Sequence, residues 1–126
     1  MAHLRKKIIE LAFLLPLLFG VGCDRSSVPP TPLSEAELPA AMAKAFEKAK
    51  PEAKDLANQI VAAVQAKDYS KAFLGLQTLT GLPALNKQQV GVAASALLTV
   101  NNLLQAAQAQ GDAKAAETIN VYRSTK

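Results

Sequence analysis

Apolar and polar positions follow the period of an α-helix through the chain after residue 38. Apolar residues recur there at spacings of three and four, alanine is abundant, and β-branched residues are scattered. Glycine and proline stand where helices would begin or end, except for Gly75 and Gly91. The pattern predicts an all-α fold, a small bundle of about four to five helices that forms one domain over residues 39–126.

Proline and capping residues place the first two helices. Residues 34–37, Ser-Glu-Ala-Glu, are a capping-box pattern, and Pro39 suits the first position of a helix. We therefore expect a first helix from Pro39 to about Lys50. Pro51 interrupts it, and a second helix is expected from about residue 52 to residue 66.

Aspartate, asparagine and glycine mark the remaining helices. Asp68 is expected to cap a third helix, which Gly81 ends. Asn86, with a glutamine three residues later, predicts a capping box and the start of a long fourth helix. Asp112 is expected to cap a short last helix.

One short segment resembles the tetratricopeptide-type repeat. Asp68-Tyr69, followed by an alanine at residue 72, is similar to the turn that opens the second helix of such a repeat. The chain contains a single copy and no repeat period. The resemblance therefore implies one helical hairpin within a bundle, and not an extended array.

The predicted fourth helix carries no charged residue from Gln88 to Gly111. An apolar stripe follows it at helical spacing, while several asparagine and glutamine side chains argue against a membrane span. Two interpretations stay open: a central helix covered on several sides, or a helix whose stripe includes a groove or a dimer seam. The stripe comprises Val90, Ala93, Leu97, Val100, Leu104 and Ala107, and the candidate interaction face within it is Val90, Leu97, Val100 and Leu104.

The first 23 residues have a different pattern. Three basic residues at 5–7 precede an apolar run over 11–21 that is interrupted only by Pro16. The run is about half the length that a membrane-spanning helix needs, which favours a secretory signal. Small residues follow it, and then Cys23, the single cysteine of the chain.

This order resembles the signal peptide of bacterial lipoproteins, in which a lipobox ends at a cysteine. The resemblance implies cleavage of residues 1–22 after Gly22, a diacylglyceryl group on the Cys23 thiol, and acylation of the new N-terminus, for example by palmitate. Gly20 departs from the lipobox, which prefers leucine or another aliphatic residue there. The implied location is the bacterial cell envelope, anchored to a membrane and facing the periplasm or the outside. Asp24 resembles the inner-membrane sorting signal of enteric lipoproteins.

Residues 23–38 are predicted to form a tether between the lipidated cysteine and the helical domain. The stretch 26–32 is rich in proline and serine, a composition that favours extended conformations and cannot bury a core. A proline-rich ligand for a partner domain is the alternative for this stretch. The alternative for Cys23 is an ordinary secreted protein with one free thiol.

Composition leaves few routes to catalysis. The only histidine is His3, inside the leader, so the remaining chain offers no Ser-His-Asp or Cys-His centre and no usual zinc site. A glycine-rich phosphate loop is also missing. We therefore expect no enzyme activity, no metal and no cofactor. Carboxylates could still act as a pair, but the candidates fall at caps or on exposed faces: Glu47, Glu52, Asp55, Asp68, Asp112 and Glu117.

The charge of the domain indicates which partners it could contact. The chain has a net charge of +4, with lysines and acidic residues interspersed along the first half of the domain. Such a mixture is typical of a solvated face, and a mild positive excess could also rest against anionic lipid or acidic wall polymers. Nucleic acid is not expected as a partner, because the sequence has no arginine cluster.

Two functions follow from these features. The first is a non-catalytic binding or accessory module, held on the bilayer by acylated Cys23, that recruits or steadies another envelope protein. The second is a structural link to peptidoglycan: Tyr122, Arg123 and Lys126 resemble the C-terminal residues of murein lipoproteins, which attach through a terminal lysine. The chain departs from that family in the spacing before Lys126 and lacks its continuous heptad repeat.

Overall fold

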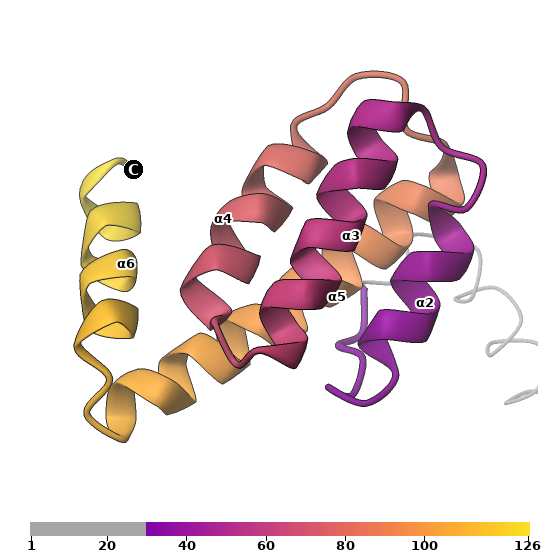
Figure 1. The fold of residues 1–126 in the computed structure, drawn as a ribbon. Coiled ribbons are helices and arrows are strands. Elements are labelled where there is room, and N and C mark those ends of the chain that lie inside the picture. Colours follow the sequence, from indigo (N-terminus) through magenta and orange to yellow (C-terminus); the bar gives the residue numbers. More distant parts are fainter. Residues whose placement is uncertain (1–29) are drawn as a thin grey trace, which may run out of the picture.

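The computed structural model describes residues 30–126, and within that range it consists of helices joined by short turns, without a strand. The described range contains five helices, which are labelled in Figure 1. The predicted all-α bundle of about four to five helices is therefore confirmed. The helices are α2 (Leu38–Ala45), α3 (Pro51–Gln65), α4 (Tyr69–Thr80), α5 (Lys87–Ala109) and α6 (Ala113–Ser124).

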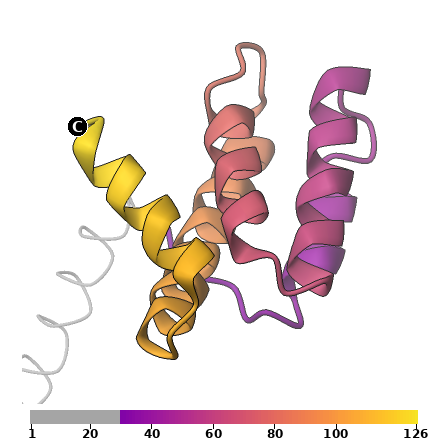
Figure 2. The same cartoon turned by 60° about the vertical axis from the view of Figure 1, so that its left-hand side comes forward.

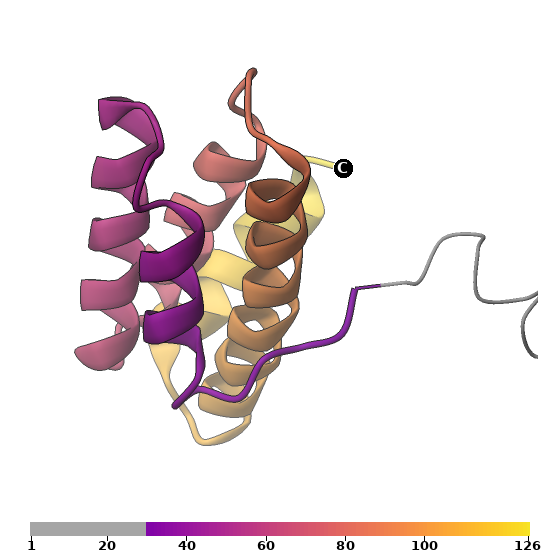
Figure 3. The ribbon, with the colours of Figure 1, turned by 90° about the vertical axis from the view of Figure 1, so that its right-hand side faces the viewer.

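Four of the helices close into a ring. Helix α2 contacts α3, α3 contacts α4, α4 contacts α5, and α5 returns to contact α2. Figure 3 shows α2 and α3 on one side of this bundle and α5 on the other. Helix α6 lies outside the ring, where it packs against α5 and α4 (Figure 2).

Side-chain caps begin three of the helices where the sequence predicted them. The Asp68 carboxylate accepts the backbone N–H of Lys71 at 3.1 Å, and Asp112 caps α6 in the same way. The Asn86 side chain accepts the Gln89 N–H at 2.8 Å, while the Gln89 side chain accepts the Asn86 N–H at 3.0 Å. This reciprocal capping box satisfies two backbone donors that the helix itself leaves unpaired.

Helix α2 is shorter than predicted. It ends at Ala45, whereas the sequence pattern suggested about Lys50. Pro51 accounts only for the residue before it: Lys50 has φ −60° and ψ 152° and is extended. Residues 46–49 form turns, and the buried Phe46 ring at their start belongs to the core.

Two helices end in Schellman motifs. After α3, the Asp68 N–H reaches back to the Ala63 carbonyl at 2.8 Å, with Lys67 at φ 61° between them. After α5, the Asp112 N–H reaches back across Gly111, which has φ 92°. Glycine suits this left-handed position, whereas lysine is strained there.

The core is built largely from alanine and medium-sized aliphatic side chains, which lets helices approach closely. Helices α3 and α4 approach each other closely at Gly75, where an added Cβ would lie 2.8 Å from Cγ1 of Ile60. A glycine inside α4 is therefore required by packing. The largest fully buried side chains are Phe46, Leu38, Met42, Ile60, Leu76, Leu79, Leu104, Val64 and Val100.

Helix α5 faces the core with most of the predicted stripe: Ala93, Val100 and Leu104 are buried, and Leu97 and Ala107 are partly buried against the core. Val90, by contrast, is 52 % exposed. Two polar residues outside the predicted stripe, Gln89 and Thr99, lie in the buried face of α5. The full buried set is Gln89, Ala93, Ala96, Thr99, Val100 and Leu104. Helix α5 contacts α2, α4 and α6, which agrees with the interpretation of a central helix covered on more than one side.

Candidate functional site

The segment before α2 is fixed to the bundle at two places. The Thr99 hydroxyl donates a hydrogen bond of 2.6 Å to the backbone carbonyl of Leu33. Farther along, the Glu35 carboxylate accepts the Tyr69 hydroxyl at 2.9 Å and forms an ion pair with the Lys67 ammonium group. Together with the fully buried Leu38, these contacts extend the folded domain to the N-terminal side of its predicted start.

Hydrogen bonding sets the protonation of this cluster. The Lys67 hydrogen bond lowers the pKa of the Glu35 carboxyl group, and the same bond raises the pKa of Lys67. Burial, followed by the bond to Glu35, raises the pKa of the Tyr69 hydroxyl. At neutral pH the cluster therefore holds one carboxylate, one ammonium group and one protonated phenol. These groups hold the segment before α2 against the start of α4.

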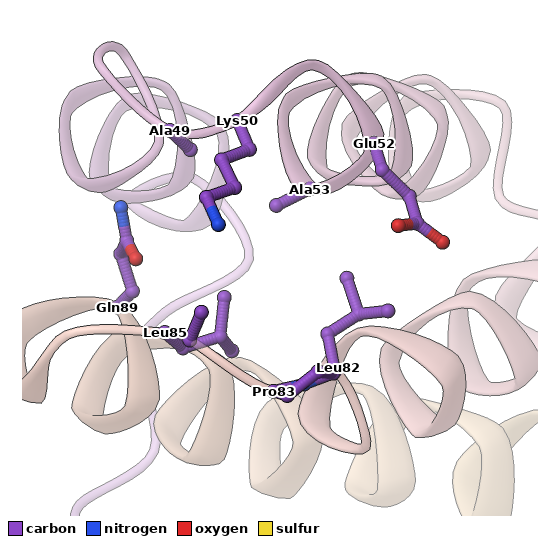
Figure 4. Close-up of a pocket in the computed structure, with 9 residues that line it drawn as sticks. Ala49, Lys50, Glu52, Ala53, Leu82, Pro83, Leu85 and Gln89 are labelled. Atoms are coloured by element: carbon purple, nitrogen blue, oxygen red, sulfur yellow. The ribbon is translucent and has the colours of Figure 1, made fainter.

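A small hollow lies between the α2–α3 turn and the α4–α5 loop. Figure 4 shows the Lys50 side chain and Leu82 extending toward the gap from opposite walls. Its volume is about 150 Å³, below the roughly 300 Å³ at which sites for small organic ligands begin. The hollow could hold a few water molecules. Its lining is Ala49, Lys50, Glu52, Ala53, Leu82, Pro83, Ala84, Leu85 and Gln89.

A larger and more apolar hollow lies between α4 and α6. The Tyr122 ring meets the Phe73 ring edge-on, with centroids 5.2 Å apart, and forms part of the wall. Leu74 and Val121 are 58 % and 55 % exposed beside it. The hollow has a volume of about 320 Å³. Its lining is Phe73, Leu74, Gln77, Glu117, Thr118, Val121, Tyr122 and Thr125.

Several residues predicted from the sequence fall outside the described residues. The proposed lipidation site Cys23, its neighbour Gly22 at the expected cleavage site, and the sorting residue Asp24 all precede residue 30. Lys126 is described and exposed, with its ammonium group 4.7 Å from the centroid of the Tyr122 ring. The neighbouring Lys126 ammonium group lowers the pKa of the Tyr122 hydroxyl.

The candidate interaction face of α5 divides between core and surface. Val100 is 0 % exposed and Leu104 is 1 % exposed, so both belong to the core. Leu97 is partly buried against that core, and Val90 is the one fully surface residue of the four. The four residues therefore do not form one exposed seam. The reason is the rotation of α5 that places Gln89 and Thr99 inside.

The carboxylates considered for catalysis are spread over several helices. Asp68 and Asp112 cap α4 and α6, and Asp68 also accepts the Lys114 ammonium group at 3.0 Å. Hydrogen bonds from Lys114 and then from the Lys71 backbone lower the pKa of Asp68. Glu47, Glu52, Asp55 and Glu117 are exposed. Within residues 30–126, no three acidic, histidine or cysteine side chains gather as metal ligands would.

The sequence pattern did not predict the Thr99–Leu33 bond, the Glu35 cluster or the α4–α6 hollow. The first two join residues far apart in the chain, and no local spacing encodes such a pairing. The apolar side chains of Leu74 and Val121 gave the only available signal for the hollow. Neither a family model, nor a curated protein, nor a solved structure matches this chain.

Proposed function

We propose that this protein is a lipoprotein of the bacterial cell envelope, anchored to a membrane by acylated Cys23, and that its helical domain is a non-catalytic binding or accessory module. The observation that carries the proposal is the order of residues 1–23: a basic start, a short apolar run, and small residues ending in the single cysteine. The resemblance of this order to a lipoprotein signal supports acylation. The neighbouring Asp24 supports retention at the inner membrane.

The segment between the proposed anchor and the folded domain is short. Cys23 comes ten residues before Leu33, the first residue bonded to the bundle. Ten residues span at most about 35 Å, so the domain would stay close to the bilayer. Each buried acyl methylene contributes about 0.8 kcal/mol, so one chain binds marginally and two or three bind firmly.

The accessory role is supported by the surface of the domain. The hollow between α4 and α6 has an apolar wall, with exposed Leu74 and Val121 at its side. Apolar surface of this kind is typical of contact with another protein when it is rimmed by polar groups, here including Gln77 and Glu117. The expected partner is an envelope protein.

The proposal is tested by labelling cells with an alkyne fatty acid and floating their membranes. Wild-type protein should carry the label and float with membranes. The Cys23→Ser variant should lose the label, while Lys126→Ala should keep it and serve as the matched control. Unlabelled wild-type protein in the soluble fraction would contradict the proposal.

The exposed side chain of Lys126 supports a second candidate, attachment to peptidoglycan. A link of this kind is an amide bond to the lysine amine, so the amine must be accessible. In the structure the Lys126 amine lies at the surface, over the Tyr122 ring. Purified sacculi from cells with wild-type protein or with Lys126→Ala separate the two roles. Covalently bound protein that disappears in the variant supports wall attachment. Equal and negligible amounts of bound protein in both sacculus samples would contradict wall attachment and leave the accessory module as the proposed function.

A further inference from the structure

The outer face of α5 is uncharged and uncovered. We define it as Val90, Gly91, Ala94, Leu98, Asn102 and Gln105, which lie on one side of the helix opposite its buried stripe. Val90 is 52 % exposed and Leu98 is 38 % exposed. Of the most apolar 18-residue window of α5, only 28 % is buried. In length and composition α5 is the one described helix that could cross a membrane.

The N-terminal segment leaves the bundle on the α5 side. Leu33 is bonded to Thr99 in the middle of α5. Figure 3 shows residues 30–33 crossing α5 and ending beyond it, on the side away from α2 and α3. The Glu35 contacts with Lys67 and Tyr69 hold the following residues in place. The segment from which an anchor would extend therefore leaves the bundle across α5, on the side away from α2 and α3.

The remaining link is short, so the side of the bundle from which it leaves is the one most easily brought to a membrane. Cys23 comes seven residues before Pro30, which gives a reach of at most about 25 Å. A helix layer with its side chains is about 10 Å thick, so a path past the α5 and α3 layers to the outer surface of α3 takes about 20 Å, most of that reach. The α5 side is the one that the link brings to the bilayer without strain.

Charge favours the same side. The outer face of α5 has no acidic group, and the nearest ionisable residue along the helix is the exposed Lys87 at its start. The exposed surface of α3 carries Glu52, Lys54 and Asp55, two acidic groups to one basic group, and is therefore less suited to an anionic lipid surface. Asn102 and Gln105 can keep their hydrogen bonds in the hydrated headgroup region, where a partly apolar helix lies in the plane of the interface.

We infer that the outer face of α5 rests on the surface of the bilayer to which Cys23 is anchored, with Leu98 and Val90 reaching into the headgroup layer. This inference rests on the proposed function, because an unacylated chain would have no reason to hold this orientation. The hollow between α4 and α6 is lined by neither Val90 nor Leu98, so a protein partner could still bind there.

The test places one fluorophore at a time on the acylated full chain. With Cys23 modified, an introduced cysteine is the only free thiol, and NBD can be attached at Leu98→Cys. Leu74→Cys is the matched control, since it replaces another exposed leucine on α4. Val90→Cys and Val121→Cys form a second matched pair if either leucine variant misfolds by circular dichroism. The probes are phosphatidylethanolamine–phosphatidylglycerol vesicles, with and without nitroxide on the lipid headgroups.

We expect nitroxide lipid to quench NBD at 98 several-fold more strongly than at 74. Equal quenching, or stronger quenching at 74, overturns the inference. If NBD at residue 98 is shielded from water but is not quenched by nitroxide lipid, a second copy or another protein covers α5. That result also overturns the inference. Intact mass is measured on the same samples before labelling: missing acyl mass contradicts the proposed function itself, whereas acylated, vesicle-bound protein with an unquenched label contradicts only the orientation.

Discussion

The hydroxyl of Thr99, in the middle of α5, donates a hydrogen bond of 2.6 Å to the backbone carbonyl of Leu33, 66 residues earlier. The Thr99 side chain is 5 % exposed, and its oxygen also lies 3.1 Å from the Ser95 carbonyl. The bond holds the N-terminal segment against α5, the helix that contacts α2, α4 and α6. It is therefore the structural connection between the predicted tether and the bundle.

Replacing this hydroxyl should loosen the N-terminal segment. Thr99→Val keeps the side-chain shape and leaves the Leu33 carbonyl without its partner, which should cost about 1 kcal/mol of unfolding free energy. Amide hydrogen exchange should become faster over residues 33–37. Thr78→Val is the matched control, because the Thr78 hydroxyl bonds only within its own helix. Equal losses in both variants would contradict a special role for Thr99.

Two glycines inside helices should respond to alanine with opposite sign. Gly75→Ala places a Cβ 2.8 Å from the buried Ile60 side chain and should destabilise the domain by about 1–3 kcal/mol. At Gly91 an added Cβ meets nothing within 4 Å, so Gly91→Ala should stabilise the domain by about 0.5–1 kcal/mol through helix propensity. Urea denaturation measures both.

The cause of the Gly75 effect can be checked with a double-mutant cycle. Ile60→Ala removes the atom that the new Cβ would meet. The cost of Gly75→Ala should then be much smaller in the Ile60→Ala background than in the wild type, because contacting residues are not additive. Equal costs in both backgrounds would place the strain elsewhere in α4.

Stability at acid pH should depend on Asp68. Its folded-state pKa is lowered, first by the Lys114 hydrogen bond and then by the Lys71 backbone. A lowered folded pKa gives stability that is present above the unfolded pKa of about 3.9 and is lost as pH falls through the folded value. Asp68→Asn retains a capping oxygen but does not titrate, so its urea midpoint should fall less between about pH 5 and pH 2.

The matched variant for this effect is Lys114→Met. It should raise the pKa of Asp68 toward its ordinary value, seen in the carboxyl carbon titration by NMR, while the bond to the Lys71 N–H keeps part of the shift. An Asp68 midpoint that does not move in Lys114→Met would show that the ion pair with α6 does not form in solution.

Helix boundaries could be predicted where local chemistry fixes them. Asp68, Asn86 and Asp112 each bond to backbone N–H groups of their own first turn, and such bonds leave a sequence signature. The end of α2 could not be placed correctly from Pro51 alone, because the turns over 46–49 depend on burying Phe46 between helices.

Hydrophobicity predicted only part of the buried face of α5. An apolar stripe assigns polar residues to the surface, yet Gln89 and Thr99 are buried. Each is satisfied by a distant carbonyl: Gln89 donates to Ala45 at 3.3 Å, and Thr99 donates to Leu33. Burying a polar group is favourable only with such a partner, and a partner 44 or 66 residues away has no local signal.

The most direct test of the account is the intact mass of the full-length protein extracted from bacterial membranes, beside a Cys23→Ala control. We predict a mature chain that begins at Cys23 and carries acyl mass, absent from the control. A chain of unmodified mass, with or without residues 1–22, would contradict the lipid anchor and with it the proposed envelope function.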